Sequence, residues 1–285
     1  MENLNYFELI NKRESCRDFA ETEVESEKLQ SLGDSFALCD ALDEDINTEL
    51  HVIDRERGAK LGGTVGYNGF MIAAPQYALL FTEEKEHCLE NAAFIMQALT
   101  LKMTSMGLAA CWLTVNDAEA ARKLAGADTE KTLAAVVAFG YRNKEKKSTR
   151  LDIASPSDVK VKKSGRTAPK IALDDFVCEG TFGSPADLDT LAPQYPELHD
   201  ALVAMSNSQS FFNRQPYRVV LTKDEICLIG LEDAETGEAD RLLNYGIAMF
   251  NFAAVNEHGG AWTFEPAAGD LRLPENAQFI AQCRL

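Results

Sequence analysis

The pattern of apolar and polar positions along the chain predicts a mixture of helices and buried strands. Apolar residues recur at helical spacing through residues 90–106, and Gly107 follows as a helix-ending glycine. Mainly apolar runs at 73–81, 108–113 and 133–141 have the length of buried strands. The first part of the chain is therefore expected to contain one long helix and at least three strands.

A second set of elements is predicted further along the chain. The pattern indicates helix 196–205, strands 217–221 and 225–230, and helix 244–254. The last of these helices is followed by Gly260 and Trp262, just as the earlier long helix is followed by Gly107 and Trp112. The repeated order of helix, glycine and tryptophan suggests an internal duplication with diverged copies.

Composition narrows the class of protein. The chain has 285 residues, of which 46% are hydrophobic and 26% charged, values that are ordinary for a globular protein. Its formal net charge of -17 argues against a nucleic-acid partner and against an anionic membrane surface. The N-terminus lacks a signal-peptide pattern, and no stretch approaches the roughly 20 apolar residues of a spanning helix. We expect a cytoplasmic protein.

The cysteines and histidines suggest no metal or disulfide chemistry. The seven cysteines are scattered without a C-x-x-C pair, which indicates reduced thiols, most of them packed as small apolar residues. The four histidines are isolated, and none has the spacing of a metal ligand. We therefore predict no metal site.

The first candidate for chemistry is a short motif near the N-terminus. Arg13 and Arg17 flank Ser15 after a predicted short helix. Guanidinium groups bind phosphate oxygens in a bidentate manner, and a serine hydroxyl adds one more donor, so the motif is a candidate phosphate site. The alternative is a solvated helix end with Arg13 and Glu14 in surface ion pairs.

Two further segments of the chain are interpreted as loops. The polar loop that precedes the predicted strand 217–221 carries Ser210, Asn213 and Gln215, whose side chains supply hydrogen-bond donors and acceptors. Its alternative interpretation is a helix end followed by a turn. The glycine-rich segment 62–69 lacks the G-x-G-x-x-G spacing and is interpreted as a loop.

These segments together resemble the FMN-dependent nitroreductase family. Arg-x-Ser-x-Arg-x-Phe at residues 13–19 resembles the opening signature of that family, and Ser210 to Pro216 resembles its second signature. Between them, the order of Ala74-Pro75, a long helix, Trp112 and a strand that ends in Gly140-Tyr141 is also similar to the family core. The resemblance extends over nearly the whole chain and is strongest at the two signatures.

The resemblance implies a set of FMN-binding residues. Arg13, Ser15 and Arg17 would hold the phosphate and ribityl chain, while Glu90 and Asn91 at the start of the long helix would approach the flavin ring. Lys163 and Arg166, in a basic segment over 142–170, would add a phosphate contact, although such a segment can also be a solvated connector. The residues implied to face the ring from the second half are Gln209, Ser210, Phe211, Asn213 and Gln215.

The resemblance also implies an architecture. The fold would be α+β and nitroreductase-like, with a first half at residues 1–183 and a shortened second half at residues 184–285. In the family, the two signatures come from different subunits of a homodimer. Here each signature occurs once, in a different half, so one chain would form an intrachain pseudo-dimer with one composite FMN site.

The implied activity is that of an oxidoreductase. NADH or NADPH would reduce FMN, and two electrons would then pass to a nitroaromatic, a quinone or a similar small acceptor in a ping-pong scheme. No side chain is assigned as catalytic, since the cofactor carries the redox chemistry. The alternatives are a flavin-binding carrier or sensor without significant turnover, and an interaction module that binds no flavin. We expect a monomer or a weak homo-oligomer whose partner is the small-molecule acceptor.

Overall fold

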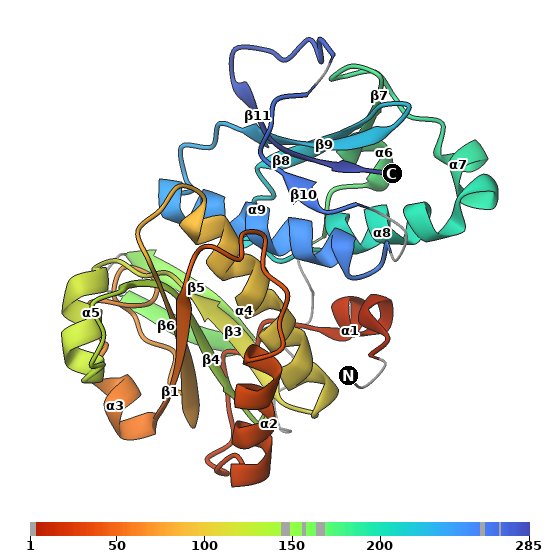
Figure 1. Cartoon of the computed structure of the whole chain (residues 1–285). Helices are drawn as coiled ribbons and strands as arrows, with labels where there is room; N and C mark the ends of the chain where they lie inside the picture. The colour runs from red at the N-terminus through yellow and green to blue at the C-terminus, as the bar shows by residue number, and fades with distance from the viewer. Residues whose placement is uncertain (1–3, 144–148, 156–157, 164–168, 257–259, 268) are drawn as a thin grey trace. The chain divides into compact units, whose positions relative to one another are not determined.

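The computed structural model describes residues 4–143, 149–155, 158–163, 169–256, 260–267 and 269–285. Contacts within the chain divide it into two compact units (Figure 1). The N-terminal unit is Lys12–Ala168, and the C-terminal unit combines Met1–Asn11 with Pro169–Leu285. The sequence predicts two related halves that meet between residues 183 and 184. These halves are defined by similarity and not by compactness, and their boundary stays a prediction.

The N-terminal unit is built on a four-stranded antiparallel sheet with the strand order β1-β2-β4-β3. Helix α4 contacts β2, β3 and β4 of this sheet, and α2 packs against α4. A separate hairpin is formed by β5 and β6. The elements of the unit are α2 (Ser26–Phe36), β1 (Thr48–Asp54), α3 (Arg55–Ala59), β2 (Gln76–Thr82), α4 (Cys88–Ser105), β3 (Ala109–Leu113), α5 (Ala118–Ala125), β4 (Thr132–Gly140), β5 (Thr149–Ser155) and β6 (Asp158–Lys163).

The C-terminal unit is built on a five-stranded sheet with the order β10-β11-β9-β8-β7. Its strands are antiparallel except for β7, which pairs in parallel with β8 at the edge. The elements are most of α1 (Tyr6–Lys12), α6 (Leu173–Phe176), β7 (Val177–Glu179), α7 (Leu188–Gln194), α8 (Pro196–Ser206), the 3-10 turn η1 (Phe211–Asn213), β8 (Tyr217–Leu221), β9 (Glu225–Leu231), α9 (Glu238–Ala253), β10 (Trp262–Thr263) and β11 (Ala277–Arg284).

The two units repeat one arrangement. In chain order, β1, β2, α4, β3 and β4 correspond to β8, β9, α9, β10 and β11, and the strand orders β1-β2-β4-β3 and β8-β9-β11-β10 match. The two tryptophans that suggested the duplication lie on corresponding strands, Trp112 on β3 and Trp262 on β10. The prediction of an α+β fold with two related halves is confirmed.

Helix α1 belongs to the unit that lies farther along the chain. The Tyr6 ring packs edge-on against the Phe250 ring of α9, with 5.7 Å between their centroids. At the other end of the helix, the Asn207 side chain donates a 2.8 Å hydrogen bond to the Asn11 side chain. The chain therefore starts in the C-terminal unit, enters the N-terminal unit at Lys12 and returns at Pro169.

Candidate functional site

The first predicted motif is an extended segment fixed to the N-terminal sheet. Helix α1 ends at Lys12, as the sequence predicts, and Ser15 then forms a parallel bridge with Ala110 at the start of edge strand β3. The backbone N–H of Cys16 donates a 2.9 Å hydrogen bond to the carbonyl of Ala110. The backbone N–H of Ala20 likewise donates to the carbonyl of Tyr141 at 2.8 Å. Backbone pairing at both ends therefore holds the motif in place.

Two positive charges gather at this edge of the sheet. Arg13 is half-buried, and burial lowers the pKa of its guanidinium to about 10, with the positive charge of Arg17 acting in the same direction. Both arginines also lie close enough to Cys111 of β3 to oppose the rise in its thiol pKa, which burial causes. Arg13 and Arg17 thus lie near each other and near Cys111 at this edge of the sheet.

Arg13 forms no ion pair in the part of the chain that the structure describes, although the charge of Glu14 acts on its guanidinium and raises its pKa. Its neighbour Glu14 instead forms an ion pair with Arg142, at 3.2 Å. Among the same described residues, the side chains of Arg13 and Ser15 form no hydrogen bond. The surface-pair alternative therefore holds for Glu14, whereas no residue in the described ranges occupies the side-chain donors of Arg13 and Ser15.

Glu90 and Asn91 lie in the first turn of α4 and are both buried. The side-chain oxygen of Asn91 accepts hydrogen bonds from the backbone N–H groups of Leu42 at 2.8 Å and Asp43 at 3.2 Å. Glu90 is 5% exposed, and burial raises the pKa of its carboxyl. Asn91 thus fixes the segment before β1, and Glu90 is a buried carboxyl that favours its protonated form more than an exposed one does.

The two basic residues predicted from the segment over 142–170 are described only in part. Lys163 is the last residue of β6, and Arg166 lies outside the described residues. Another basic residue of this segment forms a hydrogen bond, since the Lys170 side chain donates to the carbonyl of Ser208 at 2.6 Å. Sequence reasoning did not single out Lys170, whose only sequence signal was membership of the basic run.

The second predicted segment is a loop held by its own polar side chains. The Ser210 hydroxyl accepts a 3.0 Å hydrogen bond from the Gln215 backbone, and the Asn213 side chain donates a 2.8 Å bond to the carbonyl of Pro169. The Gln215 side chain accepts a 3.0 Å bond from the N–H of Ile171 and donates to the carbonyl of Ser206. These side chains therefore define the shape of residues 208–215, which we call the polar loop.

The backbone of the polar loop is strained. Phe212, Asn213 and Gln215 have φ values of 46°, 57° and 49°, in the left-handed region that bulky residues avoid. Phe212 is 48% exposed, and its ring packs against the ring of Phe211 with 4.5 Å between centroids. Local strain of this kind is often kept at binding sites because it fixes ligand contacts.

The remaining members of the predicted set flank this strained turn. Gln209 is buried at the start of the loop. The backbone N–H of Phe211 donates a 3.2 Å hydrogen bond to the side chain of Asn244 in α9. Asn244 therefore anchors the loop to the long helix of its unit, a role that the sequence analysis did not anticipate.

Both candidate segments adjoin the places where the chain passes between units. Arg13 follows the first passage, at residues 11 and 12. The polar loop is bonded to Pro169, Lys170 and Ile171, which follow the second passage. The predicted binding residues of each half are therefore tied to a connection between the units.

Membrane-spanning helices and metal-ion clusters are both absent from the described ranges. No helix there combines the length and apolar character needed to cross a lipid bilayer. The same residues contain no group of three or more histidine, cysteine, aspartate or glutamate side chains arranged to hold a metal ion.

One solved structure that covers the whole chain agrees with this architecture. A Thermotoga maritima MSB8 protein described as a "putative nitroreductase" is similar over 100% of this chain and 94% of its own, with a TM-score of 0.59 and 16% identity. An FMN-dependent nitroreductase from Clostridium difficile R20291 matches 49% of this chain and 89% of its own, with a TM-score of 0.44 and 21% identity. A nitroreductase family protein from Clostridium novyi NT matches 50% of this chain and 87% of its own, with a TM-score of 0.45 and 15% identity.

The family comparison is more specific than these structural likenesses. No curated protein matches the chain. The family described as "Putative TM nitroreductase" matches residues 5–172, which is more than half of the sequence and includes the Arg13 to Arg17 motif. The resemblance that the two signatures suggested is confirmed, and the chain belongs to this nitroreductase family of oxidoreductases.

Proposed function

We propose that the chain is an FMN-dependent oxidoreductase that takes electrons from NADH or NADPH. The observation that carries this proposal is the pair Arg13 and Arg17, which the backbone bridge at Ser15 holds together on the edge of the sheet. Two neighbouring guanidinium groups repel each other, and an anion between them relieves that repulsion. A terminal phosphate, with its negative charge and several acceptor oxygens, suits this donor set.

The residues of the N-terminal unit fit the polar end of FMN. Arg13 and Arg17 would bind the phosphate, and the Ser15 hydroxyl would donate to a phosphate or ribityl oxygen. Glu90 and Asn91 would lie near the ring, and Lys163 and Arg166 would add positive charge on the phosphate side. The available donors of Arg13 and Ser15 support the first part of this assignment.

The polar loop would bound the isoalloxazine ring in the same proposal. The side chains of Ser210, Asn213 and Gln215 are used to hold the loop, so their contribution is to position its backbone and the aromatic pair. Gln209 and Phe211 would contact the ring. The left-handed conformation at Phe212, which costs free energy without burying that side chain fully, supports a binding role for the loop.

The redox chemistry would come from the cofactor. When bound, FMN would supply the two-electron chemistry that links a nicotinamide donor to a small acceptor such as a nitroaromatic or a quinone. The chain binds the phosphate, orients the ring and shapes the acceptor side of the site. We further propose a cytoplasmic monomer or weak homo-oligomer.

Flavin binding tests the proposal directly. The purified chain is titrated with FMN and with riboflavin, which lacks the phosphate, and the change in flavin absorbance or fluorescence is followed. We expect FMN to bind more tightly than riboflavin by about 10- to 100-fold, as charge-assisted bonds to a phosphate provide. Arg17→Ala should remove most of this difference, whereas Arg57→Ala, an exposed arginine on α3 of the same unit, should leave it unchanged.

Two outcomes would contradict the assignment at different levels. A chain that takes up neither flavin in excess would refute the cofactor. Equal affinities for FMN and riboflavin would refute the role of the arginine pair. With flavin bound, anaerobic bleaching by NADH or NADPH distinguishes an oxidoreductase from a flavin carrier or sensor, which would stay oxidised.

A further inference from the structure

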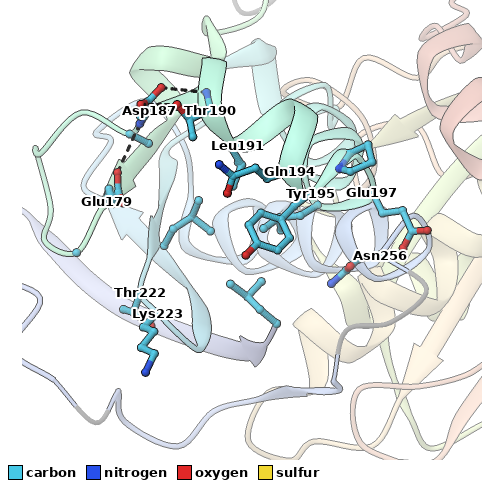
Figure 2. A pocket seen from close by; sticks show the side chains of 16 residues that line it. Glu179, Asp187, Thr190, Leu191, Gln194, Tyr195, Glu197, Thr222, Lys223 and Asn256 are labelled. Atoms are coloured by element: carbon cyan, nitrogen blue, oxygen red, sulfur yellow. Dashed lines mark hydrogen bonds between the residues drawn. The ribbon is translucent and has the colours of Figure 1, made fainter.

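A large cavity opens in the C-terminal unit, away from both predicted signatures. Its volume is about 980 Å³, within the range of small-molecule sites in proteins. Figure 2 shows its walls, which come from the corner between α7 and α8, the end of β7 and the turn after β8. Its lining residues lie between Glu179 and Leu285 and include no member of the polar loop. The cavity also lies outside residues 5–172, so the family match does not account for it.

The interior of the cavity is mainly apolar. Leu191 and Leu198 contribute from the two helices, and buried Leu221 contributes from the end of β8. Tyr195 lies among the lining side chains that Figure 2 draws, and it is 58% exposed. An exposed aromatic ring beside apolar side chains in a cavity offers a surface that a ligand can cover.

The helix corner that carries Tyr195 is rigidly built. The Tyr195 backbone N–H donates a 2.8 Å hydrogen bond to Leu191, and its carbonyl accepts a 3.0 Å bond from the backbone of His199. Pro196 occupies the first position of α8, where its fixed φ favours the helix. Asp187 caps α7 by accepting bonds from the Thr190 backbone at 3.0 Å and the Thr190 hydroxyl at 2.7 Å. The Tyr195 ring is therefore presented on a fixed backbone.

The charges around the cavity favour a cation. Three carboxylates, Glu179, Asp187 and Glu197, line it, against one ammonium group, that of Lys223. The hydrogen bonds from Thr190 lower the pKa of Asp187, so this carboxylate is ionised at neutral pH. In Figure 2 the Lys223 side chain extends away from Tyr195. The charged side chains that line the cavity are therefore mainly negative.

We propose that this cavity binds an aromatic organic cation. The ring system of the ligand would lie against the leucines, and its positive group would lie near the face of Tyr195 and the rim carboxylates. The site is separate from the proposed flavin site and does not depend on it.

Isothermal titration calorimetry with three indole compounds tests the proposal. Tryptamine is a cation, tryptophol is neutral and indole-3-acetate is an anion, while the ring system is the same. We expect saturable binding of tryptamine with one site per chain, and affinities about tenfold weaker or worse for the other two. Tyr195→Ala should weaken tryptamine binding by about tenfold. Tyr195→Phe should keep the affinity, because the aromatic face and not the hydroxyl makes the contact.

Matched charge variants separate this site from general attraction to an acidic protein. Glu197→Gln should weaken tryptamine binding, whereas Glu44→Gln, which removes an exposed carboxylate of the N-terminal unit, should not. Gln194→Trp, which fills the cavity from α7, should abolish binding. Thermal unfolding confirms that each variant is folded. Equal binding of the three compounds, unsaturable binding, or tryptamine binding that survives Tyr195→Ala and Gln194→Trp would overturn the proposal.

Discussion

The side-chain oxygen of Gln215 accepts a 3.0 Å hydrogen bond from the backbone N–H of Ile171, a residue 44 positions earlier in the chain. The other end of the same side chain donates to the carbonyl of Ser206. Gln215 is 1% exposed, so water does not replace these bonds when they are lost. One glutamine therefore joins the polar loop both to the end of α8 and to the segment that enters the C-terminal unit.

Gln215→Ala is accordingly expected to destabilise the protein. It leaves the buried backbone groups of Ile171 and Ser206 without their partner, at a cost of about 2–4 kcal/mol in the free energy of unfolding. Urea denaturation measures this change. Gln278→Ala, an exposed glutamine on β11, should change the free energy by less than about 0.5 kcal/mol. Equal stabilities of the two variants would show that the buried bonds contribute little.

Phe212 allows the strain of the polar loop to be measured. At its φ of 46°, a residue with a Cβ atom is strained and glycine is not. Phe212→Ala and Phe212→Gly remove the same ring, so their difference isolates the backbone. We expect the glycine variant to be more stable than the alanine variant by about 1 kcal/mol in urea denaturation. The opposite order, which is usual in helices, would mean that the turn is not left-handed in solution.

Asp233 contributes a pH-dependent support to the same loop. Its carboxylate receives two hydrogen bonds from Arg214, at 3.0 and 2.6 Å, and these bonds hold its pKa down to about 2. A lowered pKa in the folded state stabilises the fold at pH values above the ordinary pKa of aspartate. This stabilisation is lost as the pH falls towards about 2. Because Arg214 is half-exposed, Asp233→Asn should cost only about 1 kcal/mol at neutral pH.

The measurement is the difference in unfolding free energy between the wild type and Asp233→Asn as a function of pH. This difference should shrink between the ordinary aspartate pKa and about pH 2. Asp40→Asn, at an exposed position of the N-terminal unit, serves as the control and should show no such trend. A difference that is constant with pH would exclude the ion pair as its source.

Glu90 should show the opposite dependence on pH. Burial raises the pKa of its carboxyl, so the folded state binds the proton more tightly than the unfolded chain does. Stability from this group is present below the ordinary glutamate pKa and is lost as the pH rises through the folded-state pKa. Glu90→Gln, which keeps the shape without the charge, should therefore gain stability relative to the wild type as the pH increases.

Denaturation of the wild type and Glu90→Gln at several pH values tests this expectation. Glu44→Gln, at an exposed position of the same unit, should follow the wild type at every pH. A Glu90→Gln variant that is less stable than the wild type at neutral pH would mean that the carboxylate is stabilised by a partner, with His87 at 3.5 Å the first to test.

Local sequence patterns predicted the elements that bury one continuous apolar surface. The long helix predicted over 90–106 appears as α4, which begins two residues earlier, after His87 in a left-handed conformation, and ends at Ser105. The strand over 133–141 appears as β4. The two signature motifs were found because their residue types and spacing are specific. Features that depend on neighbours close in sequence were therefore accessible without a structure.

Features that depend on distant residues were not accessible in this way. The predicted ring contact at Asn91 gave no hint that its side chain binds the backbone of Leu42 and Asp43. The bond from Lys170 to Ser208 joins positions 38 residues apart, and no local pattern marks it. The cavity at Tyr195 is similarly formed by elements separated by up to about a hundred residues in the sequence, and Tyr195 by itself resembles any exposed tyrosine.

The placement of α1 makes the second part of the polypeptide incomplete without the first. A single cut between Lys163 and Pro169 would yield two fragments, and the first of them would carry a helix that packs in the core of the second. The contact of Tyr6 with Phe250 and the bond between Asn11 and Asn207 would then become intermolecular. The first fragment would thus hold the second through one donated helix, as the two pieces of a split protein do.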